Sequence, residues 1–289
     1  MSWRTVVISH RCKLDLSMGY MVVRGEDTSR VLIDEMAILM IENPAVSMTG
    51  CLLSELSKQK VRIIFCDEKR SPYAELQPYS GCHDCSLKIR QQSEWSEEPK
   101  KVVWTEIVYR KICNQSAVLL EHGYDKEGAM LAGYAAEIVF GDSTNREGHA
   151  AKVYFNALFG KDFSRGQENP TNAALNYGYG LLLSAFNREI TLNGYITHLG
   201  LCHDNMFNPY NLSCDLMEPF RVLVDREVIR MAPTEFGKEE KHRLLSILHS
   251  SVHIGKTTQT VLNAVKIYTH SVFDAVNERN AGKINFIEI

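Results

Sequence analysis

Residues 211–226, NLSCDLMEPFRVLVDR, carry two carboxylates, Asp215 and Glu218, three positions apart. Apolar residues at helical spacing predict a helix over 213–231, with Ser213 as its N-cap. On such a helix the two carboxylates lie on one face and repel each other by roughly a few tenths of a kcal/mol. Apolar residues share that face, so the acid pair is expected to be half-buried. A half-buried acid pair needs a cation, an arginine or a proton beside it.

Two further residues of metal-ligand type stand near predicted helix starts. Glu147 heads a stripe of small and apolar residues on a predicted helix over 144–159. His203 lies in a loop-like run, rich in Asn and Pro, just before the acidic helix. Carboxylates with one imidazole form an oxygen-rich set of donors, which suits Mg²⁺ or Mn²⁺ better than zinc.

Each of these residues also has an ordinary structural interpretation. Thr144 and Glu147 match a capping box, in which the glutamate bonds the backbone at the helix start. His203 could be a partly buried loop histidine that makes one hydrogen bond. In the acid pair, the first carboxylate could stabilise a helix dipole, and the second could form a surface ion pair with Arg221. The combination of all of them near helix starts favours a metal site.

None of these residues falls in an apolar stripe that would build the core. Replacing one of them by alanine is therefore expected to leave the fold intact, and the relief of repulsion should keep or slightly raise stability without metal. The capping interpretation predicts something different for Glu147→Ala, namely a loss of about 1 kcal/mol with activity retained.

Two regions of different periodicity position these side chains. The first reads as short strands, a hairpin turn at 24–28 and one helix near 47–56, and the expected strands are 5–9, 20–24, 31–34, 38–41 and 61–66. The second reads as helices throughout: 102–120, 128–140, 144–159, 171–193, 213–231, 238–250 and 256–277. We predict an α+β fold, with a small β-sandwich-like domain over 1–70, a linker over 71–101 and an all-α catalytic domain over 102–289.

Composition limits the classes of protein that this chain can be. At 289 residues it can bury a sizeable core, and its net charge of −3 means that any DNA binding must come from a local basic surface. The sequence shows no signal peptide and no apolar run that could span a bilayer, so we expect a cytoplasmic protein without a membrane anchor. The eight scattered cysteines are typical of reduced, buried thiols. Cys82 and Cys85 form a CxxC pair that lacks a second pair, so we interpret it as loop and not as a zinc site.

Several motifs resemble those of Cas1, the family of CRISPR-associated integrases, in its type II-A kind. The likeness extends over essentially the whole chain and is most specific at 215–221, DLMEPFR, behind a histidine loop. The other matching stretches are HRCKLD at 10–15, TGCLLSEL at 49–56, VRIIFCD at 61–67, RKICNQ at 110–115, REGHAAKVYF at 146–155 and NAALNYGY at 172–179.

The resemblance implies roles for individual residues. It implies that Glu147, His203 and Glu218 are the catalytic metal ligands and that the cofactor is Mg²⁺ or Mn²⁺. The resemblance further implies that the ligands are supported by Asp215, Asn172 and Tyr177. It implies that the DNA backbone is held by Arg110 and Lys111.

The resemblance also implies a reaction and partners. The 3′-hydroxyl of a short foreign DNA attacks a phosphodiester at the repeat end of a CRISPR array, and the metal stabilises the developing charge. The β-rich domain is expected to form a homodimer, because its short strands offer edges that need cover. A Cas2 protein would bridge two dimers on double-stranded prespacer and repeat DNA, together with other type II-A adaptation proteins.

Two alternatives remain open at this point. A metal-dependent phosphodiesterase that only hydrolyses DNA would use the same ligands, with water in place of the 3′-hydroxyl. A non-catalytic DNA-binding scaffold would use the carboxylates as helix caps and ion pairs. A strand-transfer assay separates the first alternative from the integrase, and a metal titration tests the second.

Overall fold

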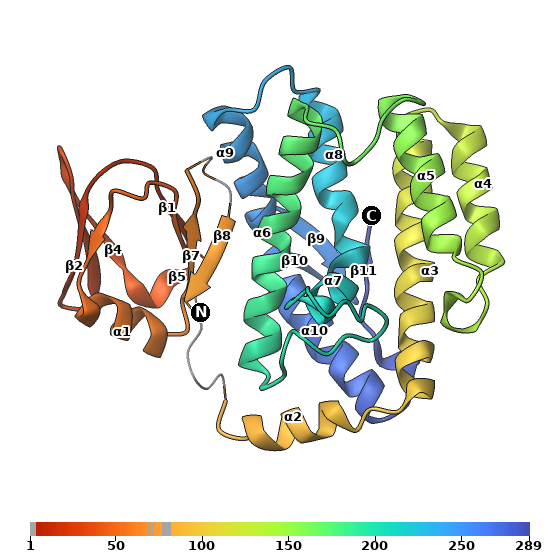
Figure 1. The fold of residues 1–289 in the computed structure, drawn as a ribbon, viewed down its shortest axis with the longest axis horizontal. Helices are drawn as coiled ribbons and strands as arrows, with labels where there is room; N and C mark the ends of the chain where they lie inside the picture. Colours follow the sequence, from red (N-terminus) through yellow and green to blue (C-terminus); the bar gives the residue numbers. More distant parts are fainter. Residues whose placement is uncertain (1–3, 69, 71, 77–81) are drawn as a thin grey trace. The chain divides into compact units, whose positions relative to one another are not determined.

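The computed structural model describes residues 4–68, 70, 72–76 and 82–289 (Figure 1). The chain forms two compact units, Met1–His83 and Asp84–Ile289. The first is β-rich and the second is mainly helical, which confirms the predicted α+β class and the order of its parts. Within the described part of the chain, no helix is long and apolar enough to cross a membrane.

The first unit contains two four-stranded sheets. One has the order β1-β5-β7-β8, and its strands are Arg4–Ile8, Met36–Ile41, Arg62–Cys66 and Pro72–Leu76. The other has the order β4-β3-β2-β6, and its strands are Thr28–Leu32, Tyr20–Arg24, Lys13–Ser17 and Ser47–Met48. The predicted hairpin joins β3 to β4 with Arg24 opposite Thr28, whereas β2, β6 and β8 were not predicted.

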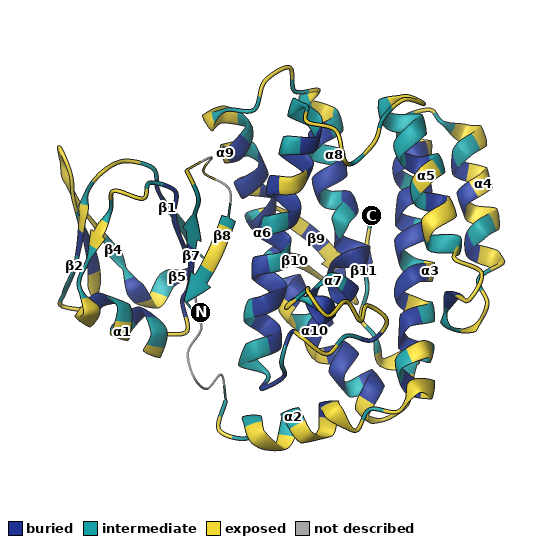
Figure 2. Cartoon of the chain, viewed as in Figure 1, coloured by how far each residue is buried: buried dark blue, intermediate teal, exposed yellow. Residues whose placement is uncertain are grey.

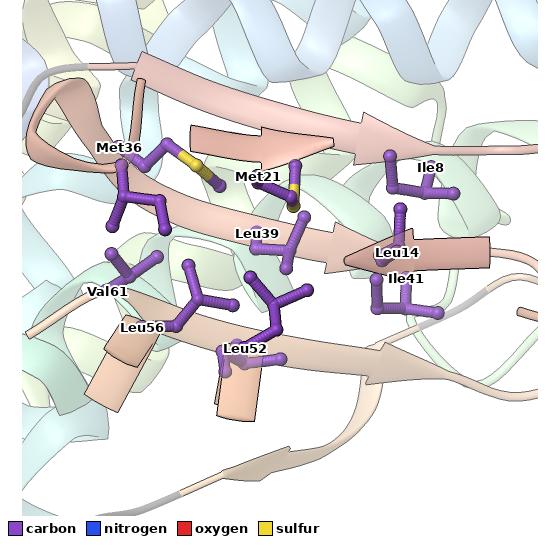
Figure 3. Packing of buried hydrophobic residues seen from close by; sticks show 11 residues of the cluster. Ile8, Leu14, Met21, Met36, Leu39, Ile41, Leu52, Leu56 and Val61 are labelled. Atoms are coloured by element: carbon purple, nitrogen blue, oxygen red, sulfur yellow. The ribbon is translucent and has the colours of Figure 1, made fainter. Parts of the chain in front are cut away.

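The core of the first unit is formed by both sheets and helix α1, Gly50–Lys58. Figure 3 shows its side chains pointing toward one another, from Ile8 on β1 to Leu52 and Leu56 on α1. All six residues of β5 are buried, as expected for a strand between two parallel neighbours. The hydroxyl of Thr49 accepts from the backbone N–H of Leu52 at 3.3 Å and caps α1, the helix expected near 47–56.

The second unit is organised around three long helices, α3 (Glu97–Glu121), α6 (Pro170–Leu192) and α10 (Val261–Asn277). Figure 2 shows these helices largely buried, whereas α2 is mostly exposed. The remaining α-helices of the described chain are α2 (Cys85–Ser93), α4 (Asp125–Ala136), α5 (Arg146–Phe159), α7 (Asn211–Met217), α8 (Arg221–Met231) and α9 (Lys238–Ser246). Helix α3 packs against α4, α5, α8 and α10, so residues from many parts of the chain meet along it.

The predicted helix over 213–231 is interrupted. Helix α7 is followed by a 3₁₀ turn, η3 (Glu218–Phe220), before α8 begins. Pro219 lacks a backbone N–H and cannot continue an α-helical ladder, which explains the break. Ser213 is not the N-cap, because α7 already begins at Asn211; its buried hydroxyl instead donates to the side-chain oxygen of Asn187.

A small sheet also interrupts the predicted helical pattern. Strands β9 (Ser251–Ile254), β10 (Thr257–Thr260) and β11 (Ile287–Glu288) form a three-stranded sheet in the order β10-β9-β11. Gly255, with φ of +60°, makes the turn between β9 and β10, and β-branched threonines favour the extended state that follows. The second unit is therefore not wholly α-helical. The expected linker over 71–101 holds β8, α2 and the first turn of α3.

The cysteines follow the sequence prediction in part. All eight are free thiols, as expected. Cys51 and Cys202 are exposed, however, so their predicted burial is wrong. Cys85 begins α2, and among the described residues no group of three or more His, Cys, Asp or Glu side chains is arranged to hold a metal ion.

Helices α6 and α8 approach each other closely at a glycine. A Cβ atom on Gly178 would lie 2.4 Å from Cγ1 of Val224. We expect Gly178→Ala to lower the free energy of unfolding by about 1–3 kcal/mol, because either side chains or backbone must shift to make room. Gly133, in the interior of α4, offers a matched control, because a Cβ atom there would meet no atom of the described chain within 4 Å beyond its own helix backbone.

Gly133→Ala should raise stability by about 0.5–1 kcal/mol, since alanine loses less backbone entropy in a helix. Urea unfolding of both variants measures the two effects. Equal stabilities for the two variants would contradict the close approach of α6 and α8.

Candidate functional site

The position of Glu147 is set by the turn that precedes α5. The carboxylate of Asp142 accepts from the backbone N–H groups of Arg146 at 2.8 Å and Glu147 at 3.0 Å. The N-cap is Asn145, in the left-handed region with φ of 54°, and its side chain accepts from the backbone N–H of Gly148. The capping box expected from Thr144 is therefore wrong, and the Glu147 carboxylate points to another partner.

That partner is Lys111 on α3. Its Nζ lies 2.6 Å from Oε1 of Glu147 and 2.5 Å from Oε2 of Glu218, so one ammonium bridges two carboxylates. Lys111 is only 6% exposed. Burial lowers the pKa of Lys111, but the charges of Glu218 and Glu147 outweigh that effect and leave the pKa above its usual value. Lys111 thus carries a charge at neutral pH, and the pair of carboxylates has its cation.

Glu218 lies in η3 and is 3% exposed. Nε of Arg221 donates to its Oε1 at 2.8 Å, so the predicted pairing is confirmed, whereas the predicted surface location is wrong. Burial raises the pKa of Glu218, but the opposite effect of Arg221 and Lys111 is larger and lowers the pKa to about 2. Although Oε2 lies close to the Lys111 ammonium, it has no hydrogen-bond donor in suitable geometry within the described chain.

Asp215 organises the loop that carries His203. It is completely buried, and its carboxylate accepts from the backbone N–H groups of Leu201 at 2.6 Å, Cys202 at 3.0 Å and His203 at 3.2 Å. Its Oδ1 also lies 2.5 Å from Nδ1 of His203. Asp215 is not in the first turn of α7, so the helix-dipole interpretation is wrong. A carboxylate that holds a loop and an imidazole together is a positioning group.

The surroundings of His203 place it beside the two glutamates. The hydrogen bond to Asp215 is the main cause of a raised His203 pKa, and the charges of Glu218 and Glu147 contribute to it. The ring of Trp104 meets the imidazole edge-on, with 5.8 Å between centroids. A Cβ atom on Gly200 would lie 2.3 Å from the backbone oxygen of His203, so only glycine lets the loop fold this tightly.

A cavity of about 430 Å³ opens beside His203. Trp104 and His203 line it together with Lys100 and Lys101 on α3 and Asp204 on the loop. Aromatic and cationic side chains in one cavity suit the bases and phosphates of a nucleic-acid strand.

The donor types suit a hard divalent cation, although among the described residues no group of three or more His, Cys, Asp or Glu side chains is arranged around a metal position. Glu147 and Glu218 already face one cation, the Lys111 ammonium, whose Nζ lies 2.6 Å from Oε1 of Glu147 and 2.5 Å from Oε2 of Glu218. Because Asp215 engages Nδ1 of His203, Nε2 is the ring nitrogen that can face a metal. Two carboxylates and one imidazole suit Mg²⁺ or Mn²⁺.

The structure thus brings Glu147, His203, Glu218 and Asp215 together, and it gives Lys111 an unexpected place. Lys111 was expected to contact DNA from the surface. It is instead buried between the glutamates, because α3 runs through the interior of the second unit. The sequence offered no signal for this role, since lysine spacing does not reveal which helix face is covered.

The other predicted residues make contacts of a different kind. Asn172 ties the loop before α6 in place, since its Nδ2 donates to the backbone oxygens of Ser164 at 2.8 Å and Gln167 at 3.0 Å. The Tyr177 ring packs edge-on against Phe236 and lies under the Lys241 ammonium. The guanidinium of Arg110 lies over the Phe286 ring at 5.2 Å.

Sequence reasoning missed a further buried carboxylate near the site, beside Glu218 and Asp215. Asp225 on α8 accepts from the hydroxyl groups of Tyr154 at 3.1 Å and Tyr179 at 2.5 Å. Its burial raises the pKa to about 6, despite both hydrogen bonds. The guanidinium of Arg221 lies 4.7 Å from the centre of the Tyr179 ring, so this cluster packs against the partner of Glu218. Its position four residues after Arg221 is the signal that could have drawn attention to it.

Comparison with known proteins identifies the family. The family profile described as "CRISPR associated protein Cas1" matches residues 5–246. The chain belongs to the Cas1 family. A "CRISPR-associated endonuclease Cas1" from Neisseria meningitidis serogroup C (strain 8013) is 35% identical over 295 residues, covering 100% of this chain and 97% of that relative. This result confirms the resemblance to Cas1, whereas the type II-A assignment stays a prediction.

Solved structures share the Cas1 fold. One chain of a "Cas6-RT-Cas1--Cas2 complex" superposes with a TM-score of 0.78 and 17% identity over 98% of this chain. The match spans only 36% of that longer chain. A "Casposase bound to integration product" superposes with a TM-score of 0.77 and 17% identity, over 97% of this chain and 92% of its own.

The two glutamates that meet Lys111 should differ in their effect on stability. Glu218→Ala leaves two buried cations, Lys111 and Arg221, without their carboxylate, and we expect it to cost about 3–5 kcal/mol. Glu147→Ala should cost much less, because Lys111 keeps its contact with Glu218. This difference replaces the expectation that removing either carboxylate would relieve repulsion. Chemical unfolding in EDTA measures both variants, and equal losses would contradict the central place of Glu218.

Asp225 should make stability depend on pH. Its folded pKa of about 6 lies above its ordinary value of 3.8, so its protonation favours the folded state. The stabilisation is fully present below about pH 4 and is lost as pH rises through 6, an effect on the order of 2–3 kcal/mol. The raised pKa of His203 acts in the same direction near and above pH 6.5. The free energy of unfolding should fall less between pH 4.5 and pH 7 in Asp225→Asn than in the wild type. Equal falls in the two proteins would contradict the assignment of this pH dependence to Asp225.

Proposed function

We propose that this Cas1 chain is a metal-dependent DNA integrase and endonuclease of CRISPR adaptation, of the type II-A kind. It inserts short foreign DNA as spacers by attack of a 3′-hydroxyl on the phosphodiester of a repeat. The observation that carries this proposal is the meeting of Glu147 and Glu218 at one buried cation, the Lys111 ammonium, with His203 near enough for both carboxylates to raise its pKa. The subtype rests on the sequence motifs, above all DLMEPFR at 215–221.

Each residue of the site has a defined task in this reaction. Glu147, Glu218 and His203 would hold Mg²⁺ or Mn²⁺, which when bound polarises the scissile phosphate and stabilises charge on its oxygens. Arg221 holds Oε1 of Glu218, so that the other carboxylate oxygen stays directed at the cation position. Asp215 keeps the imidazole oriented through Nδ1. No side chain acts as a nucleophile, because the attacking group belongs to the DNA.

The cavity beside His203 offers a place for the reacting DNA. Lys100 and Lys101 would face backbone phosphates, and Trp104 would present an aromatic surface next to the imidazole. Charge and aromatic contact hold a single strand without reading its sequence. A DNA end held there lies next to the ligands, and such positioning supplies much of the rate of a phosphoryl transfer.

The proposed partners follow from the family and from relatives. The "Cas6-RT-Cas1--Cas2 complex" contains Cas2 beside its Cas1 part, and we propose a Cas2 protein that bridges two homodimers of this chain. The β-rich unit supplies the dimer contact in this proposal. Double-stranded prespacer and repeat DNA complete the assembly in the cytoplasm, with other type II-A adaptation proteins.

A phosphodiesterase that only hydrolyses DNA is the second candidate, since water could replace the 3′-hydroxyl at the same ligands. The casposase neighbour is described as bound to an integration product, which favours strand transfer. A scaffold without catalysis accounts less well for the site. Two glutamates directed at one buried cation form a desolvated charge cluster, which is costly to build. A surface that only binds DNA does not require such a cluster.

The test is a strand-transfer assay on a supercoiled repeat plasmid with Mn²⁺ and purified Cas2. Glu147→Ala, His203→Ala and Glu218→Gln should each lower the strand-transfer rate at least 100-fold, because losing a ligand removes several kcal/mol of transition-state stabilisation. Glutamine is used at 218 to keep an acceptor for Arg221. Asp215→Asn should lose about tenfold, since it acts on the orientation of His203.

Thr144→Ala provides the control, because Thr144 is not the cap of α5, and its rate should equal that of the wild type. DNA that ends in a 3′-deoxy nucleotide separates the two reactions. Plasmid nicking that persists with this DNA, without joined products from 3′-hydroxyl ends, would establish the hydrolytic alternative. Full activity in the Glu147→Ala and His203→Ala variants would overturn the site itself.

A further inference from the structure

We infer that Lys111 is a built-in counter-ion of the acidic site: its ammonium holds the cation position between Glu147 and Glu218 when no metal is bound, and a divalent metal binds by displacing it. The inference rests on the metal site of the proposed function. It assigns to Lys111 control of metal affinity, a role separate from catalysis.

The contacts of Lys111 carry the first step. Its Nζ lies within 2.6 Å of a carboxylate oxygen on each side, from α5 and from η3. The side chains of Lys111 and Glu218 are 8% and 4% exposed, so water screens these charges little. Without a cation the two carboxylates would face each other in a medium that penalises like charges. The lysine therefore holds the two carboxylates together in the metal-free protein.

The second step concerns space and charge. Mg²⁺ binds oxygens at about 2.0–2.1 Å, so an ion held by both glutamates would occupy the gap that the ammonium now fills. Two cations cannot share that gap, because they would repel each other strongly at such a distance. Metal binding to both carboxylates therefore requires Lys111 to leave.

The third step is that the ammonium can be exchanged without dismantling the site. Oε2 of Glu218 meets Lys111 as an ion pair and lacks a hydrogen-bond donor in suitable geometry among the described residues. Oε1 of the same carboxylate is held separately by Arg221. When the ammonium leaves, Arg221 keeps Glu218 in place, and Asp142 keeps the backbone of Glu147 in place. The cost of displacing Lys111 lowers the apparent affinity for the metal.

The test measures Mn²⁺ binding to the full chain, by electron paramagnetic resonance of free Mn²⁺, together with melting temperatures in EDTA. Lys111→Met keeps an unbranched apolar side chain, one heavy atom shorter than lysine, and removes the charge. We expect Lys111→Met to bind Mn²⁺ at least tenfold more tightly than the wild type. We also expect the melting temperature of Lys111→Met to be lower than that of the wild type in EDTA. Addition of Mn²⁺ should raise the melting temperature of the variant more than that of the wild type.

Lys152→Met is the matched control. Lys152 is exposed on α5, the helix that carries Glu147, and its substitution removes the same formal charge. Its Mn²⁺ affinity should equal that of the wild type. An equal gain in affinity for Lys152→Met would show a general effect of net charge and would overturn the assignment to Lys111.

Unchanged or weaker Mn²⁺ binding by Lys111→Met would also overturn the inference, because the lysine would then be neutral for the metal or would support its ligands. If Lys111→Met does not fold without metal, Lys111→Gln takes its place, since its amide can still donate to a carboxylate. Glu147→Gln tests the metal site itself. Equal Mn²⁺ binding by Glu147→Gln and the wild type would reject the metal site of the proposed function, independently of the result for Lys111.

Discussion

The second unit of this Cas1 chain depends on the neutralisation of carboxylates that it buries. Glu218 and Asp215 lie almost wholly out of water, where an unpaired charge would cost several kcal/mol. The chain meets this constraint in two ways. Glu218 is placed between Lys111 and Arg221, and Asp215 receives three backbone N–H groups together with His203. As a result, α3, the turn η3 and the loop that carries His203 lie together around the buried carboxylates.

This constraint explains why the site is built from distant elements. Helix α3 contributes Lys111, α5 contributes Glu147, and the turn between α7 and α8 contributes Glu218. The break at Pro219 helps to place Glu218, because it frees the Pro219 carbonyl oxygen to accept from Asn114 on α3 at 2.9 Å. This hydrogen bond holds the turn against α3. Stability and ligand placement therefore rest on the same contacts, and a change in one is expected to alter the other.

The site contains two kinds of group: side chains that fix the positions of the backbone and of Glu218, and carboxylate oxygens that meet the Lys111 ammonium. Asp215, Arg221 and Asp142 are committed to backbone or side-chain partners that fix the loop, the turn and the helix start. Oε1 of Glu147 and Oε2 of Glu218 face the centre, and both meet one side chain, the ammonium of Lys111. Supports held in place around a cation position suit the metal-dependent phosphoryl transfer that we propose, because ligands must be in place before the metal arrives.

The sequence by itself determined the division into a β-rich and a helical part, because the period of apolar residues differs between strands and helices. It also determined the candidate ligands, since Glu147, His203 and the acid pair have donor types that suit one ion. Only the tertiary structure decided how these groups are used. Periodicity along a chain does not show which distant side chain fills a buried gap, so the place of Lys111 and the tyrosine contacts of Asp225 could not be predicted. The resemblance implied a supporting role for Asp215, but not the backbone contacts by which it holds the loop. Those contacts arise because the helices packed around α3 bury charged groups, which must then find partners within the protein.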